Sequence, residues 1–341
     1  MKIIKYPSRE QWADLIRRPQ IDTTQLHATV SSILSEVKAH GDDAVRKYEE
    51  QFDHAQLHTL AVTEAEMEEA ERLVSDDLKA AIVLAHRNIA KFHEAQQFES
   101  HKIETCEGVE CWQKSVAIEK VGLYIPGGTA PLFSTVLMLA TPAKIAGCRQ
   151  IVLCTPPNRE GKVNPAILVA ARVAGVSHVF KAGGVQAIGA MAYGTESIPR
   201  VYKIFGPGNQ YVMAAKQLVS LHDTAIDMPA GPSEVCVVAD ASSDAEFVAA
   251  DLLSQAEHGI DSQVFLITTS EEMLQKVTEQ VDVQLAALPR KEIAQQSLNN
   301  SIFVLVRDEA EAMDLSNAYA PEHLIIATSN YERLAEKVVN A

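Results

Sequence analysis

The chain has 341 residues, of which 47% are hydrophobic and 22% are charged, and this length suggests about two domains. Acidic residues outnumber basic ones by 45 to 30, which gives a formal net charge of −15. Such a charge disfavours a nucleic-acid-binding protein, because phosphates require a basic surface.

Neither a membrane span nor a secretory signal is expected from the sequence. No apolar run approaches the length needed to cross a bilayer, and the first residues lack the apolar core of a signal peptide. We therefore expect a cytoplasmic protein that handles small molecules and binds neither nucleic acid nor a membrane.

The first third of the chain has the pattern of amphipathic helices. Apolar residues recur at helical spacing over residues 26–37, and Gly41 is expected to end that helix. Thr63 and Glu66 have the spacing of a capping box, which predicts the start of a further helix.

From residue 120 onward, short apolar runs alternate with helical stretches. The runs are VGLYIP, IVLCTP, VFKAGG, KIFGPG, EVCVVAD, VFLITT, SIFVLV and HLIIAT. Unbroken apolar strands between helices are typical of parallel sheets that are covered on both faces. We predict an α/β protein with two doubly wound parallel sheets and a cleft between them.

Four glycine-bearing loops lie at the ends of the predicted strands. They are IPGGTAP at 125–131, AGGVQA at 182–187, FGPGNQ at 205–210 and MPAGPSE at 228–234. The first three lead into helices, whose free N–H groups favour a phosphate. None has the G-x-G-x-x-G spacing of a dinucleotide fingerprint, and tight turns alone would also require glycine. Three such loops together favour a phosphate-bearing ligand.

Two further groups of polar residues are candidates for chemistry. In LLSQAEHGIDSQ, at 252–263, Gln255 and His258 share one helical face with Asp251. They form either a solvated face or a set of metal ligands, although glutamine is an uncommon ligand. In APEHLI, Glu322 and His323 stand at the entry to a strand, where they are either an acid–base pair or an exposed pair without function.

Five longer runs resemble histidinol dehydrogenases, and the resemblance covers essentially the whole chain. The runs are GLYIPGGTAPLFSTVLMLATPAKIAGC, KIFGPGN, AIDMPAGPSEV, DLLSQAEHGIDSQ and PEHLII. The resemblance implies a zinc- and NAD-dependent alcohol/aldehyde oxidoreductase of histidine biosynthesis. Its substrate would be L-histidinol, which is oxidised to histidinal and then to L-histidine.

The resemblance also assigns roles to individual residues. Gln255 and His258 are implied to bind zinc and to contact the substrate, and Ser233 is implied to contact the substrate as well. Glu322 is implied to activate water in the second oxidation. His323 is implied to act as acid and base and to contact the substrate. The positions that match NAD contacts are Tyr124, Gln186 and Asn209.

The domain organisation is a further implication of the resemblance. It divides the chain into a helical N-terminal arm at 1–22, a first domain from 23–123 and 235–341, and a second, NAD-side domain at 124–234. Both domains are expected to be incomplete Rossmann-like folds.

Members of the resembled family carry a C-terminal tail with two further zinc ligands, an Asp and a His, and an acidic residue for the substrate. That tail crosses to the partner subunit of a homodimer. This sequence ends at Ala341 without it, so we expect weaker zinc binding and impaired catalysis, because zinc sites normally use three or four protein ligands.

Two other functions fit the same residues. One is a related zinc- and NAD-dependent dehydrogenase of another small alcohol, such as a sulfonated diol. The other is a non-catalytic fragment that binds NAD without chemistry.

Overall fold

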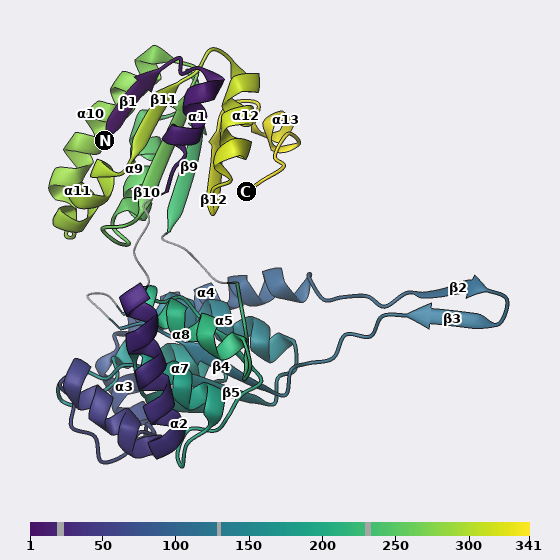
Figure 1. Cartoon of the computed structure of the whole chain (residues 1–341), viewed down its shortest axis with the longest axis vertical. Helices are drawn as coiled ribbons and strands as arrows, with labels where there is room; N and C mark the ends of the chain where they lie inside the picture. Colours follow the sequence, from purple (N-terminus) through teal and green to yellow (C-terminus); the bar gives the residue numbers. More distant parts are fainter. Residues whose placement is uncertain (19–23, 128–130, 229–232) are drawn as a thin grey trace. The chain divides into compact units, whose positions relative to one another are not determined.

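The chain folds into two α/β units, each built around its own parallel sheet (Figure 1). The structure is a computed structural model that describes residues 1–18, 24–127, 131–228 and 233–341. Unit 1 comprises residues 1–21 and 230–341, and unit 2 comprises residues 22–229. The prediction of an α/β protein with two parallel sheets is confirmed.

Unit 1 contains a five-stranded sheet in the order β1–β11–β10–β9–β12, with every neighbouring pair parallel. Its strands are β1 (Lys2–Lys5), β9 (Glu234–Ala239), β10 (Gln263–Thr268), β11 (Ile302–Leu305) and β12 (His323–Ala327). Its helices are α1 (Arg9–Leu15), α9 (Ala245–Ala256), α10 (Glu271–Ala287), α11 (Lys291–Asn299), α12 (Glu309–Tyr319) and α13 (Tyr331–Ala335).

The strands of unit 1 are apolar throughout because both faces of the sheet are covered. Every residue of β9, β10 and β11 is buried. Side chains alternate between the faces, so Val235 and Val237 pack with α9 and α10, whereas Cys236 and Val238 pack with α1 and α12. This two-sided burial explains why the sequence shows unbroken apolar runs.

The N-terminal segment differs from the predicted helical arm. Residues 2–5 form the edge strand β1, which pairs with β11 in parallel register, and only then does α1 begin. The run KIIK is too short and too mixed in polarity to mark a strand by itself. Its strand conformation depends on the edge of β11, which lies about 300 positions further along the chain.

Unit 2 contains a second five-stranded sheet in the order β6–β5–β4–β7–β8, again parallel. Its strands are β4 (Lys120–Tyr124), β5 (Gln150–Thr155), β6 (His178–Lys181), β7 (Lys203–Phe205) and β8 (Ala225–Ile226). Its helices are α2 (Thr24–Phe52), α3 (Glu64–Leu73), α4 (Asp76–Glu94), α5 (Phe133–Ile145), α6 (Pro165–Val173), α7 (Gly184–Tyr193) and α8 (Gln210–Ser220).

Two local predictions for the helical region are confirmed. Gly41 has φ +51° and breaks α2 into two helical pieces. Thr63 and Glu66 form the predicted capping box at the start of α3. The hairpin of β2 (Lys102–Cys106) and β3 (Val109–Trp112) was not predicted; it is exposed along its length and extends from unit 2 (Figure 1).

The helical first third packs within unit 2, which differs from the predicted grouping of 23–123 with 235–341. The apolar face of α2, including Val30 and Val37, packs in the same core as Ile188 of α7 and Val212 of α8. On the other face of the sheet, Ile82 of α4 joins the core formed by α5 and α6. An amphipathic pattern predicts that a helix packs against something, but it does not identify the sheet.

Candidate functional site

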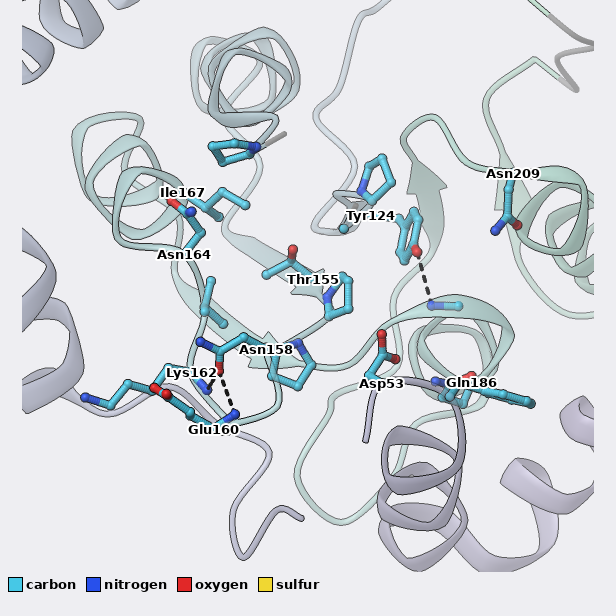
Figure 2. Close-up of a pocket in the computed structure, with 18 of the residues that line it drawn as sticks. Asp53, Tyr124, Thr155, Asn158, Glu160, Lys162, Asn164, Ile167, Gln186 and Asn209 are labelled. Carbon is cyan, nitrogen blue, oxygen red and sulfur yellow. Dashed lines mark hydrogen bonds between the residues drawn. The ribbon is translucent and has the colours of Figure 1, made fainter. Parts of the chain in front are cut away.

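The carboxyl edge of the unit 2 sheet, where its strands end, borders a cavity of about 1130 Å³ (Figure 2). Tyr124 ends β4 and Thr155 ends β5, and both line the cavity, as do residues from the starts of α7 and α8. This is the edge at which doubly wound folds bind their ligands. The volume suits a nucleotide-sized molecule.

Tyr124 lies on the wall of this cavity and is 4% exposed. Its hydroxyl oxygen accepts a hydrogen bond of 3.1 Å from the backbone N–H of Gly184 (Figure 2). Burial raises the pKa of Tyr124 well above its ordinary value, so the phenol keeps its proton at physiological pH. Tyr124 therefore joins the end of β4 to the first residue of α7.

Gln186 lies in the first turn of α7 and is 1% exposed. Its side-chain Nε2 donates a hydrogen bond of 2.7 Å to Oε1 of Glu49. The same carboxyl oxygen accepts a hydrogen bond of 2.8 Å from the backbone N–H of Gly183. Two buried polar atoms, Oε1 of Gln186 and Oε2 of Glu49, have no hydrogen-bond partner among the described residues.

Asn209 caps the N-terminus of α8 and also lines the cavity. Its side-chain oxygen accepts hydrogen bonds from the backbone N–H groups of Tyr211 at 3.0 Å and Val212 at 3.1 Å. Capping commits this oxygen to the helix, which leaves the amide nitrogen of Asn209 to meet a ligand.

The turn before Asn209 is fixed by a buried lysine. Lys216 donates a hydrogen bond of 2.7 Å to the backbone oxygen of Gly206 and forms an ion pair with Asp227. Asp227 in turn accepts a hydrogen bond of 2.8 Å from the backbone N–H of Gly206. Gly206 has φ +130°, and a Cβ atom there would lie 2.1 Å from the backbone oxygen of Tyr124. Only glycine allows this close approach of two cavity walls.

Two carboxyl groups, those of the buried Glu49 and the half-buried Asp53, lie beside the cavity, and the sequence patterns did not identify them. Glu49 and Asp53 stand one turn apart at the end of α2, and Asp53 lines the cavity. Burial is the main factor that raises the pKa of Glu49 to about 8, and burial also raises the pKa of Asp53. The available signal was a glutamate within the apolar pattern of Val45, Tyr48 and Phe52.

Two of the four glycine loops lie in full within the described residues, and both border the cavity. Gly184 and Gln186 come from the loop at 182–187, and Asn209 comes from the loop at 205–210. The loops at 125–131 and 228–234 lie partly outside the described residues, at 128–130 and 229–232. Pro126, Gly127 and Pro131 of the first of these loops line the cavity.

The other candidate residues gather at the amino edge of the unit 1 sheet, where its strands begin. Ser233 immediately precedes β9, and His323 is the first residue of the neighbouring strand β12. Gln255 lies at the end of α9, which returns from the end of β9 to the start of β10. The backbone N–H of Gln263, the first residue of β10, donates a hydrogen bond of 3.2 Å to the backbone oxygen of Ser233.

Glu322 and His323 lie close together, as their adjacency predicts. Oε1 of Glu322 is 3.8 Å from Nε2 of His323, and the two side chains are 46% and 57% exposed. Oε2 of Glu322 accepts a long hydrogen bond of 3.4 Å from the backbone N–H of Glu234. Both side chains are accessible to a substrate and to water.

The loop before Glu322 is held by Arg18. The guanidinium forms an ion pair with the buried Glu234 and donates hydrogen bonds of 2.8 and 2.9 Å to the backbone oxygens of Tyr319 and Ala320. Ala320 has φ +50°, an uncommon conformation for a residue with a side chain. Arg18 thus fixes the turn that immediately precedes Glu322 and His323.

Gln255 lies in the last turn of α9, and His258 follows the C-cap of that helix. Gln255 is 7% exposed, His258 is exposed, and neither side chain has a hydrogen bond within the part of the chain that the structure describes. Among those same residues, no group of three or more His, Cys, Asp or Glu side chains is arranged to hold a metal ion. Zinc sites normally use three or four protein ligands, so two side chains alone would not complete one.

The fold and the cavity define the class of this protein as a doubly wound α/β protein with a nucleotide-sized site at the carboxyl edge of a parallel sheet. The sequence profile of the histidinol dehydrogenase family matches residues 16–341, and the chain belongs to this family. The family is NAD-dependent, and the prediction of an oxidoreductase of this family is confirmed.

Three relatives illustrate the similarity. The histidinol dehydrogenase of Bacteroides thetaiotaomicron is 67% identical over 341 residues, which cover 100% of this chain and 80% of the relative. That of Escherichia coli K12 is 51% identical over 335 residues, or 97% and 76% of the two chains. The crystal structure of histidinol dehydrogenase from Elizabethkingia anophelis has 50% identity and a TM-score of 0.97, and the match covers 100% of this chain and 79% of that chain. Among the described residues, no helix is long and apolar enough to cross a membrane.

Proposed function

We propose that this protein oxidises L-histidinol through histidinal to L-histidine and passes two hydrides in turn to NAD. The observation that supports the site assignment is the grouping of residues that lie far apart in the sequence. Tyr124, Gln186 and Asn209 border one cavity of unit 2. Ser233, Gln255, His258, Glu322 and His323 lie at one edge of the unit 1 sheet.

NAD is proposed to occupy the cavity of unit 2. The hydrogen bonds of Gly184 and Gly206 hold the turns that precede or begin α7 and α8, and the positive dipole ends of these two helices favour a phosphate. The amide nitrogen of Asn209 and the oxygen of Gln186, both without a protein partner among the described residues, are suited to contact the nucleotide. These donors and acceptors fit a dinucleotide without a G-x-G-x-x-G motif.

His323 and Glu322 are proposed to carry the proton transfers. The His323 imidazole would take the hydroxyl proton of the alcohol, because histidine is the most common general base in enzymes. Glu322 would remove a proton from the water that attacks the aldehyde in the second oxidation. Its long hydrogen bond to the backbone of Glu234 leaves most of its accepting capacity for that water.

Gln255 and His258 are proposed to bind zinc. Their side chains have donor atoms without hydrogen bonds inside the described part of the chain, which fits a metal-binding role. A bound zinc ion would orient the substrate and polarise its oxygen. Ser233, at the start of β9, would contact the substrate beside these ligands.

The family resemblance also leads us to propose a homodimer. Sedimentation velocity at micromolar concentration should show a species of twice the chain mass of 37.2 kDa. A monomer under the conditions in which the protein turns over would refute the dimer without affecting the proposed chemistry.

A substrate panel tests the proposed reaction. The protein, supplied with zinc and NAD, should produce NADH from L-histidinol and also from added histidinal. Turnover of another small alcohol with none of L-histidinol would favour the related dehydrogenase. Binding of NAD without hydride transfer to any member of the panel would favour the non-catalytic alternative.

A further inference from the structure

Glu49 is a fully buried carboxyl group without a counter-charge among the described residues. It is 0% exposed, and within the described ranges no Lys or Arg forms an ion pair with it or with Asp53. Oε1 accepts hydrogen bonds from Gly183 and Gln186, whereas Oε2 lacks a hydrogen-bond partner among the described residues. A charge in such a place is costly unless it is neutralised by a proton.

Asp53 brings a second carboxyl group to the same place. One of its oxygens lies 3.3 Å from the position that a Cβ atom of Gly183 would take, and its carboxyl group lines the cavity (Figure 2). Repulsion between the two carboxyl groups when both are ionised favours one proton on the pair. Glu49 is the member that is shielded from water, and its pKa of about 8 places the proton there near neutral pH.

The neighbours of the pair provide little compensation. Tyr124 of β4 and Cys154 of β5 stay protonated, because burial raises the pKa of each well above its ordinary value. Burial raises the pKa of Asp53, whereas the electrostatic interaction with His54 lowers it and so favours the ionised carboxylate. Gln186 and Gly183 of the α7 side contribute neutral donors. The proton on Glu49 is thus what allows Asp53 to remain ionised beside it.

We propose that Glu49 is a positioning residue of the nucleotide site, and that its carboxyl group must hold a proton for the dinucleotide to bind. This inference rests on the proposed function, which places NAD in this cavity. Oε1 of Glu49 accepts hydrogen bonds from Gln186 and Gly183 in either protonation state and so holds this turn in place, while the proton limits the negative charge that faces the ligand.

The direction of the pH effect follows from the charge of the ligand. The diphosphate of NAD is anionic, so its arrival beside the carboxyl pair favours the protonated form of Glu49. The complex therefore binds more protons than the free protein, and by reciprocity the affinity for NAD falls as the pH rises through the pKa of Glu49. For one linked proton, the dissociation constant rises by at most about tenfold per pH unit.

Titration calorimetry with NAD tests the proposal between pH 6.5 and 9.5 at constant ionic strength. The unmodified protein should lose affinity above about pH 8, by about tenfold or more at the highest pH. Glu49→Gln keeps the shape and removes the titration, so its dissociation constant should stay near the low-pH value throughout. Glu50→Gln, an exposed neighbour on the same helix, should follow the unmodified protein.

Asp53→Asn provides a second variant in case Glu49→Gln does not fold. Removal of the neighbouring charge makes Glu49 easier to ionise, so the loss of affinity should begin at a lower pH. An unchanged slope in Glu49→Gln, an unshifted transition in Asp53→Asn, or NAD binding that is independent of pH in the unmodified protein would each overturn the inference and leave the proposed function intact. Failure to bind NAD at any pH would overturn both.

Discussion

The side-chain amide of Gln186 donates a hydrogen bond of 2.7 Å to Glu49, which precedes it by 137 positions. This bond ties the end of α2 to the first turn of α7. The helical first third of the chain therefore does more than cover the unit 2 sheet. Through this bond, α2 holds in place a residue that lines the cavity of the proposed NAD site.

The stability of the protein should decrease with pH because of Glu49. Its pKa is about 8 in the folded state against an ordinary value of 4.5, so the folded state binds more protons between these values. The free energy of unfolding contributed by this group is therefore fully present below about pH 4.5 and is lost as the pH rises through 8. Glu49→Gln should remove this loss.

Thermal unfolding at pH 5 and pH 9 measures the effect. The melting temperature of Glu49→Gln, relative to that of the unmodified protein, should be higher at pH 9 than at pH 5. Glu50→Gln serves as the control, since its carboxylate is exposed. Equal differences at the two pH values would show that Glu49 does not titrate in this range.

Gly206→Ala should destabilise unit 2 strongly. The new Cβ atom would lie 2.1 Å from the backbone oxygen of Tyr124, so either β4 or the turn before α8 must move. We expect a loss of about 2–4 kcal/mol in the free energy of unfolding, together with weaker NAD binding.

Gly108→Ala is the matched control for this substitution. Gly108 also has a positive φ, +82°, but apart from its chain neighbours no atom of the described residues lies within 4 Å of the position that its new Cβ atom would take. It should lose only about 1 kcal/mol, the conformational part of the effect. Similar losses in urea denaturation for the two variants would mean that the contact with Tyr124 is relieved without cost.

Arg18→Ala should destabilise unit 1, because the buried Glu234 would lose its ion pair and two backbone oxygens would lose a donor. The side chain of Arg18 is 41% exposed, which allows water to compensate in part. We expect a loss of about 1–3 kcal/mol in urea denaturation.

A double-mutant cycle identifies the origin of that loss. Arg18→Ala combined with Glu234→Gln should cost less than the sum of the two single substitutions, because the buried charge is then absent. Additive costs would argue against a direct coupling of Arg18 to Glu234. Turnover should decrease as well, since Arg18 also fixes the loop that precedes Glu322.

Substitution of the proposed zinc ligands should reduce metal content. Gln255→Leu and His258→Leu each remove a donor, so zinc affinity should fall by more than the roughly 10- to 100-fold typical of supporting residues. Zinc would be measured by mass spectrometry after dialysis against a weak chelator. His222→Leu, an exposed histidine of unit 2, should retain the zinc content of the unmodified protein. Unchanged zinc content in both ligand variants would show that zinc binds to other residues.

Glu322→Gln should slow the second oxidation more than the first. Loss of the carboxylate that activates water is expected to cost about 10²- to 10⁴-fold, whereas removal of the alcohol proton is assigned to His323. Histidinal should then accumulate and be recovered with an aldehyde-trapping reagent. Glu332→Gln, an exposed glutamate of α13, is the control. Rapid conversion of histidinal by Glu322→Gln would show that Glu322 does not activate the attacking water.

Sequence patterns predicted the parallel sheets because a strand that is buried on both faces consists of consecutive apolar residues. The apolar runs at β9, β10 and β11 contain no polar break within the buried strand core, and the capping box at Thr63 and Glu66 is a contact between residues three positions apart. The loops that border the cavity were likewise predictable, since glycine marks turns at the ends of strands.

The remaining features depend on contacts between distant parts of the chain. The strand β1 forms only against β11, and the apolar face of α2 gives no sign of the sheet that it covers. The role of Glu49 depends on Gly183 and Gln186, which no local pattern connects to it. The candidate residues of unit 1 lie at the amino edge of their sheet, so the rule that ligands bind at the carboxyl edge of a parallel sheet would not have found them.

The most direct test of the proposed function is the stoichiometry of the complete reaction. A limiting amount of L-histidinol is incubated with the protein, zinc and excess NAD until absorbance at the NADH band stops rising, and L-histidine is then quantified. We expect two NADH and one L-histidine for each L-histidinol consumed. One NADH with an aldehyde as the final product, or no NADH at all, would contradict the proposed function.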